Sequence, residues 1–236
     1  KYIGKYGYMN KQTDINEKMR AILVDWIVDV HARFKLRDET LFLTINLIDR
    51  YLEKCEIPRQ KLQLVGITCM LIASKYEEIY APEIKDFVYV TDKAYSREEI
   101  LDMEGKILAA LEFKLTTTTS HRFLERYANV HDADERTYML AKYLVELSLI
   151  ECRMLKYTPS NIAGSALYLA CKILKRSAWD ECLANTTQYT EQEIRPCAKD
   201  LCVLLQNAPK MSLQAIRTKF AHAKYMEISK IQLDRY

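Results

Sequence analysis

The sequence predicts an all-α protein built from two tandem five-helix folds, each arranged around a buried central third helix. Three observations predict this architecture. Apolar residues recur at helical spacing along most of the chain, with little strand-like alternation. Only 5 Gly and 5 Pro occur in 236 residues, too few for a loop-rich β-sandwich. The apolar pattern of the first half also recurs in the second.

The predicted helices are segments whose apolar residues recur every three or four positions. The strong predictions are Glu17–Phe34, Glu39–Lys54, Lys61–Glu78, Ser96–Ala110, Glu135–Ile150, Ser160–Lys175 and Thr190–Gln206. Shorter helices are predicted at Ala81–Val90, His121–Ala128, Ala178–Ala184 and Leu213–Ala223. Pro58, Pro82 and Pro159 fall at or just before helix starts, where a missing N–H costs nothing.

The internal repeat is clearest in the second and third helices. A shift of 97 residues places Asp49 on Glu146 and Lys75 on Lys172, among matching apolar positions. Any two amphipathic helices can be brought into apolar register, so coincidence is the alternative. Two helices that agree at one offset favour a duplicated module of about 100 residues.

Matched helix caps follow the repeated helices at a slightly shorter offset. Ser96 and Thr190 each stand at the N-cap of a predicted helix, and Glu99 and Glu193 follow three residues later, which is the capping-box pattern. We place the junction near 116–120. The predicted domains are an N-terminal extension 1–16, an N-terminal module 17–117, a C-terminal module 118–224 and a C-terminal tail 225–236.

The third helix of each module differs from the others. Around Gly66, apolar or small residues cover every side of the helix for more than two turns, and the segment around Gly164 has the same character. A helix that is hydrophobic all round is buried all round. Each module is therefore expected to wrap around this helix.

The helix at 17–34 carries more apolar surface than one core can cover. Steps of about 100° per residue place Met19, Ile22, Leu23 and Trp26 on one arc, with Asp29 beside it. Such an arc suits a peptide that carries a basic residue followed by an aliphatic one. The alternative is a deeply buried helix with solvated aspartates, and periodicity alone leaves both open.

Four charged residues interrupt otherwise apolar helices: Arg20, Asp49, Lys75 and Glu104. Buried charges need partners. We expect two structural ion pairs, Arg20 with Asp49 and Lys75 with Glu104. The alternative is that all four side chains reach solvent.

Composition argues against several classes of function. The 35 basic and 32 acidic residues nearly cancel, whereas nucleic-acid binding favours a concentrated basic face. Seven cysteines form no C-x-x-C pair and four histidines lack zinc-site spacing, so we expect no disulfide framework, metal or cofactor. No phosphate-binding loop or nucleophile motif occurs, so no catalytic residue is assigned. A soluble, intracellular protein without a membrane span is expected.

The string Met19–Trp26 (MRAILVDW) is similar to the signature that opens the cyclin box. The similarity continues in order through Leu41–Leu52, Lys61–Glu78 and Phe87–Asp92, and it covers nearly the whole chain. The chain resembles a mitotic cyclin. Arg33–Leu36, Ala73–Glu78 and Leu140–Leu144 lean toward the B type, and Gly7–Met9 is similar to both A and B types.

The resemblance implies a non-catalytic, activating subunit of a cyclin-dependent protein kinase in G2/M control, both nuclear and cytoplasmic. In this family the cyclin holds the kinase's mobile C-helix and moves its activation loop off the substrate cleft. This is a population shift toward the active arrangement. The kinase-binding residues that the resemblance implies are Lys75, Tyr76, Glu77, Glu78, Ile79, Glu104, Phe113 and Leu115.

The resemblance also implies a patch that docks Arg-x-Leu substrates and inhibitors. Its residues are Met19, Ile22, Leu23, Trp26, Asp29, Leu62 and Gln63. Asp29 stands where A-type cyclins carry a longer Glu, so its contact with arginine is expected to be weaker or bridged by water. The tail and short helix that precede the box in such cyclins are not found, so we expect a trimmed folded core.

The sequence leaves other classes of function as alternatives. Tandem cyclin folds also occur in transcription-factor-IIB-like nucleic-acid adaptors, but the concentrated basic helix of such a protein is missing. A scaffold that has lost its kinase is a further alternative, which Lys75 and Glu104 argue against. Catalysis by the paired acids Glu77 and Glu78 is disfavoured, because neighbouring residues on a helix point apart.

Overall fold

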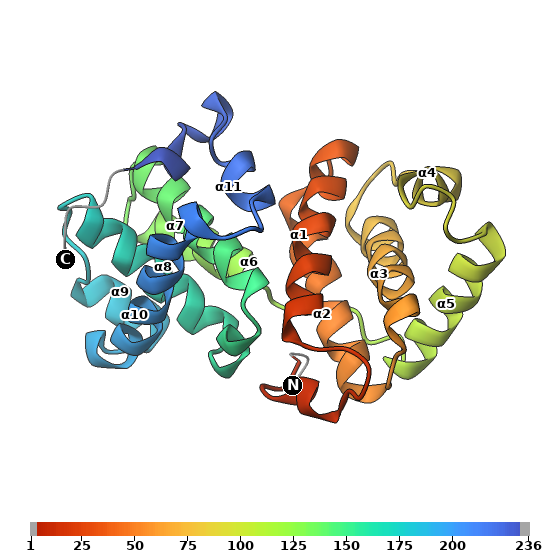
Figure 1. Ribbon diagram of the computed structural model, residues 1–236. Coiled ribbons are helices and arrows are strands. Elements are labelled where there is room, and N and C mark those ends of the chain that lie inside the picture. Colours follow the sequence, from red (N-terminus) through yellow and green to blue (C-terminus); the bar gives the residue numbers. More distant parts are fainter. Residues whose placement is uncertain (1–3, 232–236) are drawn as a thin grey trace. The chain divides into compact units, whose positions relative to one another are not determined.

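The computed structural model describes residues 4–231. These residues form helices and no β-strand, which confirms the all-α prediction. The chain divides into two compact units, 1–117 and 118–236, coloured red to yellow-green and green to blue in Figure 1. Residues 1–3 of the predicted extension and 232–236 of the predicted tail lie outside the described residues.

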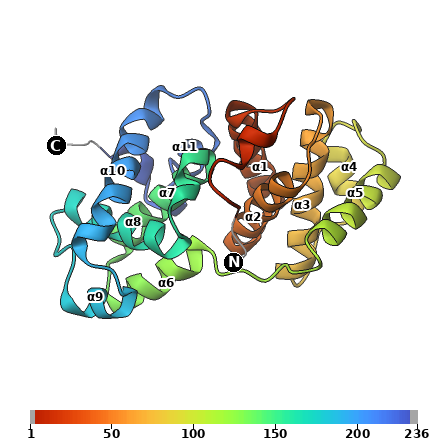
Figure 2. The same ribbon diagram turned by 90° about the horizontal axis from the view of Figure 1, so that it is seen from below.

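The first unit is arranged around its third long helix. Its elements are η1 Tyr8–Lys11, α1 Glu17–Phe34, α2 Asp38–Lys54, η2 Arg59–Lys61, α3 Leu62–Glu77, α4 Ile84–Val90 and α5 Arg97–Ala110. Helix α3 packs against α1, α2, α4 and α5, and it lies between α2 and α5 in Figures 1 and 2. The predicted central third helix is confirmed.

Close approach between α1 and α3 depends on a glycine. Every residue of α3 from Leu64 to Ser74 is buried. A Cβ atom at Gly66 would lie 2.7 Å from Cδ1 of Leu23 on α1. Any side chain at this position would therefore force the buried Leu23 side chain to move.

The segment before α1 packs onto α2. The hydroxyl of Tyr8 donates to Oδ1 of Asp49 at 2.8 Å. The amide of Gln12 donates to the carbonyls of Leu52 and Cys55 at 2.6 and 2.7 Å, which satisfies the C-terminal end of α2. The four-residue η1 was not predicted, because one 3₁₀ turn is too short to show helical periodicity.

The second unit repeats the plan and adds a C-terminal segment. Its elements are α6 Ser120–Val130, α7 Glu135–Ile150, η3 Cys152–Lys156, α8 Pro159–Ile173, α9 Glu181–Thr187, α10 Glu191–Asn207, η4 Ala208–Lys210, α11 Ala215–Lys219, η5 Ala223–Tyr225 and η6 Ile228–Lys230. Helix α8 packs against α6, α7 and α10.

Nowhere in residues 4–231 is a helix both long and apolar enough to cross a membrane.

The shorter helices differ from the prediction. Helix α9 starts at Glu181 rather than Ala178, because Oδ1 of Asp180 accepts the Leu183 N–H at 2.7 Å and caps the helix. Helix α11 is shorter than the predicted 213–223. Buried Ile228 belongs to η6, which packs on α7, so packing continues into the predicted tail. Both predicted capping boxes are present.

Candidate functional site

Lys75 near the end of α3 and Glu104 in α5 form the ion pair expected from the sequence. The Lys75 Nζ atom lies 2.7 Å from Oε1 and 2.8 Å from Oε2 of Glu104. The Lys75 side chain is 49% exposed, whereas that of Glu104 is 13% exposed. Such a half-exposed pair adds little stability. Its effect is to hold the lysine ammonium in a fixed place at the surface.

Large apolar side chains are exposed on the segments that follow α3 and α5. The side chains of Ile79 and Phe113 are 85% and 71% exposed. The neighbouring Tyr80, which was not predicted as a site residue, is 91% exposed. The sequence pattern could have predicted this residue, because Ile79 and Tyr80 are consecutive apolar residues just after the predicted end of a helix. These exposed side chains make the segments after α3 and α5 candidates for contact with another protein.

Tyr76 joins the two exposed segments. Its hydroxyl forms a hydrogen bond with the hydroxyl of Thr116, which ties the chain after α5 to the end of α3. We call the eight predicted residues of this region the Lys75 face: Lys75, Tyr76, Glu77, Glu78, Ile79, Glu104, Phe113 and Leu115. Glu77 and Leu115 are partly exposed.

Phe113 is presented by a strained backbone. Glu112 and Phe113 have φ angles of 54° and 55°, in the left-handed region that aromatic residues rarely adopt. Each such residue costs about 1–3 kcal/mol. A hydrogen bond from the Phe113 N–H to the Leu108 carbonyl, at 2.9 Å, holds this conformation. Neither residue is glycine, so no sequence signal predicted the turn.

Glu78 is engaged within the unit. Its Oε1 atom accepts the Arg37 N–H at 2.8 Å and the Thr40 hydroxyl at 2.5 Å. These bonds satisfy the N-terminal end of α2, where no side-chain N-cap bond is present. Glu78 therefore anchors the backbone that carries Ile79.

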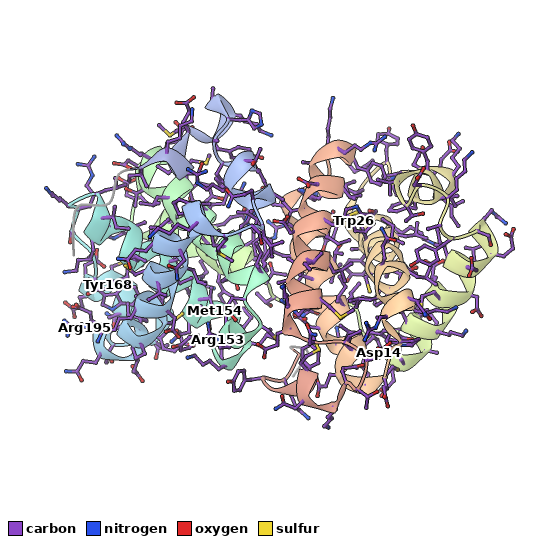
Figure 3. All side chains as sticks on the ribbon, in the orientation of Figure 1. Asp14, Trp26, Arg153, Met154, Tyr168 and Arg195 are labelled. Atoms are coloured by element: carbon purple, nitrogen blue, oxygen red, sulfur yellow. The ribbon has the colours of Figure 1, made fainter. Side chains whose placement is uncertain are left out.

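The second predicted surface lies on α1 and the start of α3. Ile22 is 50% exposed, and Trp26, labelled in Figure 3, is partly exposed. Leu23 and Leu62 are only 5% exposed each, so they form the base of the surface rather than its contact layer. We call the seven predicted residues the α1 patch: Met19, Ile22, Leu23, Trp26, Asp29, Leu62 and Gln63.

Asp29 lies at the edge of the α1 patch. Asp29 is exposed overall, but the partial burial of its carboxylate raises the pKa of that group above the ordinary value.

Gln63 at the start of α3 and Lys75 near its end are separated by about 18 Å along the helix. The α3 end of the α1 patch therefore lies well away from Lys75.

A buried ion pair supports α1. Arg20 donates from Nε to Oδ1 and from Nη2 to Oδ2 of Asp49, at 2.6 and 2.8 Å. Both side chains are about 2–3% exposed. This is the second ion pair expected from the sequence, and it fixes α1 against α2. The pair is structural, because neither side chain can reach a partner protein.

A Cys–His–Asp cluster occurs in the second unit. Sγ of Cys171 lies 3.5 Å from Nε2 of His131, and Nδ1 of His131 lies 3.2 Å from Oδ2 of Asp180. Nε2 also lies 3.0 Å from the Ser177 carbonyl, and burial raises the pKa of the Cys171 thiol to about 11. A buried neutral thiol is a poor nucleophile. The role of the cluster is therefore structural: its contacts hold the end of α6, helix α8 and the loop after α8 together.

Among residues 4–231, no three His, Cys, Asp or Glu side chains form a candidate metal site.

Family models match both units. The model described as "Cyclin, N-terminal domain" matches residues 1–116, and "Cyclin, C-terminal domain" matches residues 118–234. The G2/mitotic-specific cyclin-B of Dictyostelium discoideum is 47% identical over 95% of this chain and 52% of that protein. That of Spisula solidissima is 46% identical over 98% of this chain and 54% of that protein. The chain thus spans about half the length of these curated relatives.

Solved structures share the fold. A viral cyclin from herpesvirus saimiri has a TM-score of 0.75 at 20% identity, over 84% of this chain and 88% of that chain. A chain of the yeast RNA Pol II CTD kinase CTDK-1 complex has a TM-score of 0.71 at 14% identity, over 92% of this chain and 80% of that chain. At these identities the likeness concerns the fold alone.

Proposed function

The chain belongs to the cyclin family, and we propose that it is the activating subunit of a cyclin-dependent protein kinase in G2/M control. The relatives named G2/mitotic-specific cyclin-B support the proposal at 46–47% identity. In this proposal the chain performs no chemistry. It binds the kinase region formed by the C-helix and activation loop and changes the conformation of the active centre.

The observation that carries the proposal is the Lys75 face. Lys75 is held at the surface by Glu104, and Phe113 is held outward by a strained turn. A fixed cation beside exposed apolar side chains suits a protein helix that brings apolar residues and a carboxylate or free backbone carbonyls. The face is already arranged before the partner binds, which lowers the entropy cost of association.

Burial of the exposed side chains on and beside this face can supply much of the free energy needed to shift a kinase to its active conformation. Inverting a 1:99 equilibrium between active and inactive kinase requires a preference of about 5.5 kcal/mol. Burying Ile79 and Phe113 of this face, and the neighbouring Tyr80, supplies roughly 1.5–3 kcal/mol for each side chain, before the entropy cost of ordering them is subtracted. Contacts made only with the active arrangement of the kinase can therefore supply most of the required preference.

The α1 patch is proposed to dock Arg-x-Leu substrates and inhibitors. Half-exposed Ile22 and partly exposed Trp26 offer an apolar surface for the leucine. Asp29 offers a carboxylate for the arginine guanidinium in a charge-assisted hydrogen bond. The separation from the Lys75 face allows kinase and substrate to be held together.

The test is reconstitution. A monomeric cyclin-dependent kinase is assayed for histone phosphorylation with and without the purified chain. We expect the chain to raise kinase turnover, and the chain with ATP and histone alone to transfer no phosphate. Unchanged kinase turnover over a full titration of the chain would overturn the proposal.

A further inference from the structure

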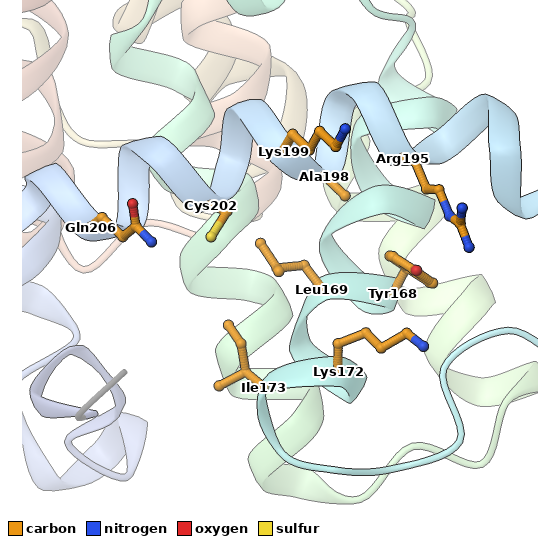
Figure 4. Close-up of a pocket in the computed structure, with 9 residues that line it drawn as sticks. All are labelled: Tyr168, Leu169, Lys172, Ile173, Arg195, Ala198, Lys199, Cys202 and Gln206. Carbon is orange, nitrogen blue, oxygen red and sulfur yellow. The ribbon is translucent and has the colours of Figure 1, made fainter. Parts of the chain in front are cut away.

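The second unit contains a groove between α8 and α10, shown in Figure 4, with a volume of about 390 Å³. Leu169, Ile173, Ala198 and Cys202 line its apolar part. Burial raises the pKa of the Cys202 thiol, so this side chain is neutral and apolar at ordinary pH. The groove therefore offers a surface that an aliphatic or aromatic side chain can fill.

Three cationic residues line the groove, Lys172, Arg195 and Lys199, and none of the described lining residues is acidic. In Figure 4 the ammonium of Lys172 and the guanidinium of Arg195 lie at the same end as the Tyr168 hydroxyl, away from Ile173. The Lys172 ammonium lies 5.5 Å from the centre of the Tyr168 ring.

One acid contacts this end from outside. Glu191 accepts hydrogen bonds from the Tyr168 hydroxyl at 2.7 Å and from Arg195 at 2.8 Å. These bonds lower the pKa of Glu191, so it is charged at neutral pH. It offsets one of the three cations. The groove end remains positive, and Arg195 retains donors for a second carboxylate.

The internal repeat relates this groove to the Lys75 face. Lys172 is the repeat equivalent of Lys75, and the offset of the matched caps places Ala198 at the position of Glu104. In the first unit Lys75 pairs with Glu104, whereas in the second unit Ala198, which lines the groove, stands at the position of that acid.

We propose that the groove binds an acidic segment of a partner protein, with an aliphatic or aromatic side chain in the apolar part and carboxylates against Lys172 and Lys199. Charge complementarity and the apolar lining together favour this occupant. Nucleic acid would use the cations and leave Leu169 and Ile173 uncovered. The groove is a docking site distinct from the proposed kinase contact.

The test uses the purified chain and a fluorescein-labelled peptide, Glu-Asp-Leu-Leu-Glu-Asp-Leu-Phe-Glu-Glu. We expect fluorescence anisotropy to show saturable binding that weakens about tenfold in K172E/K199E, because two attractive contacts become repulsive. The matched control K210E/K224E makes the same charge change at exposed lysines outside the groove and is expected to retain binding. Equal losses in the two variants would overturn the proposal.

Two further measurements test the apolar part of the groove. The same peptide with each Leu and Phe replaced by Gly is expected to bind at least tenfold more weakly. Bound peptide is expected to slow iodoacetamide modification of Cys202 but not of exposed Cys182. Equal binding of the glycine peptide, or stronger and steeply salt-dependent binding of duplex DNA, would contradict a peptide site.

This proposal and the proposed function fail separately. K172E/K199E is expected to activate a cyclin-dependent kinase as the natural chain does, because neither lysine belongs to the Lys75 face. Loss of activation in this variant, with the fold intact by circular dichroism, would overturn the assignment of the groove as a distinct site.

Discussion

Lys219 and Glu146 form a buried ion pair in the second unit, with Nζ 2.7 Å from Oε1 and 2.8 Å from Oε2. Their side chains are 6% and 0% exposed. Glu146 is the repeat equivalent of Asp49, which pairs with Arg20 on α1. Both units thus bury an acid in their second helix. The first takes its cation from α1, and the second takes it from α11.

We expect Lys219→Met to destabilise the second unit by about 3 kcal/mol, because Glu146 would be left charged and buried without its lysine. The chain has two tryptophans, Trp26 and Trp179, one in each unit. In a Trp26→Phe background, Trp179 fluorescence during urea unfolding reports the stability of the second unit.

Two controls separate charge burial from packing. Glu146→Met/Lys219→Met should recover most of the loss, because apolar replacements of a buried pair are often neutral. Lys230→Met removes an exposed pair with Glu227 and should change stability by less than about 1 kcal/mol. A double variant as unstable as Lys219→Met would show that packing, rather than the unpaired charge, is responsible.

Gly66→Ala is expected to lower the stability of the first unit by about 1–3 kcal/mol, because the added Cβ meets Leu23 at 2.7 Å. Gly105 on α5 is the matched control, since a Cβ there has no atom within 4 Å. Gly105→Ala should be neutral or stabilise by up to about 1 kcal/mol. Thermal unfolding of both variants tests this. A milder effect at Gly66 than at Gly105 would contradict the close α1–α3 packing.

Trp26→Ala is expected to leave kinase activation on histone unchanged and to raise KM for an Arg-x-Leu substrate. Truncation removes part of the apolar surface proposed to take the leucine, at a cost of about 2 kcal/mol, or roughly thirtyfold. Steady-state kinetics on matched substrates with and without the Arg-x-Leu motif measures the effect. Equal losses on both substrates would mean that Trp26 serves the fold rather than docking.

Binding of an Arg-x-Leu peptide is expected to weaken as pH falls through the pKa of Asp29, because protonation removes the charge that faces arginine. Partial burial raises this pKa, so the loss should begin at a higher pH than for an ordinary aspartate. Asp29→Asn should bind about tenfold more weakly at pH 7 and show a flatter profile. Isothermal titration between pH 7 and 4.5 measures both. Parallel profiles would exclude Asp29 as the titrating group.

Periodicity predicted the long helices well, because one face of each is buried. Helices α1 and α7 have the predicted bounds, 17–34 and 135–150. It failed for α9, where capping by Asp180 rather than apolar spacing fixes the start. The short η1 and the partner of Glu146 were also missed. Lys219 lies 73 residues from Glu146, so no local pattern links them.

The site was predictable where it depends on residue type and less so where it depends on backbone conformation. The charges of Lys75 and Glu104 in apolar helices predicted their pairing. The left-handed turn at Phe113 left no sequence signal, because glycine is absent from it. Glu78 had an unexpected role in capping α2, since its partners lie about 40 residues earlier in the chain.

The most direct test compares two repeat-equivalent lysines in one assay. Histone phosphorylation by a monomeric cyclin-dependent kinase is measured with the natural chain, Lys75→Ala and Lys172→Ala. The account predicts that Lys75→Ala abolishes activation, whereas Lys172→Ala activates like the natural chain. Full activation by a folded Lys75→Ala variant would contradict the claim that the Lys75 face binds and activates the kinase.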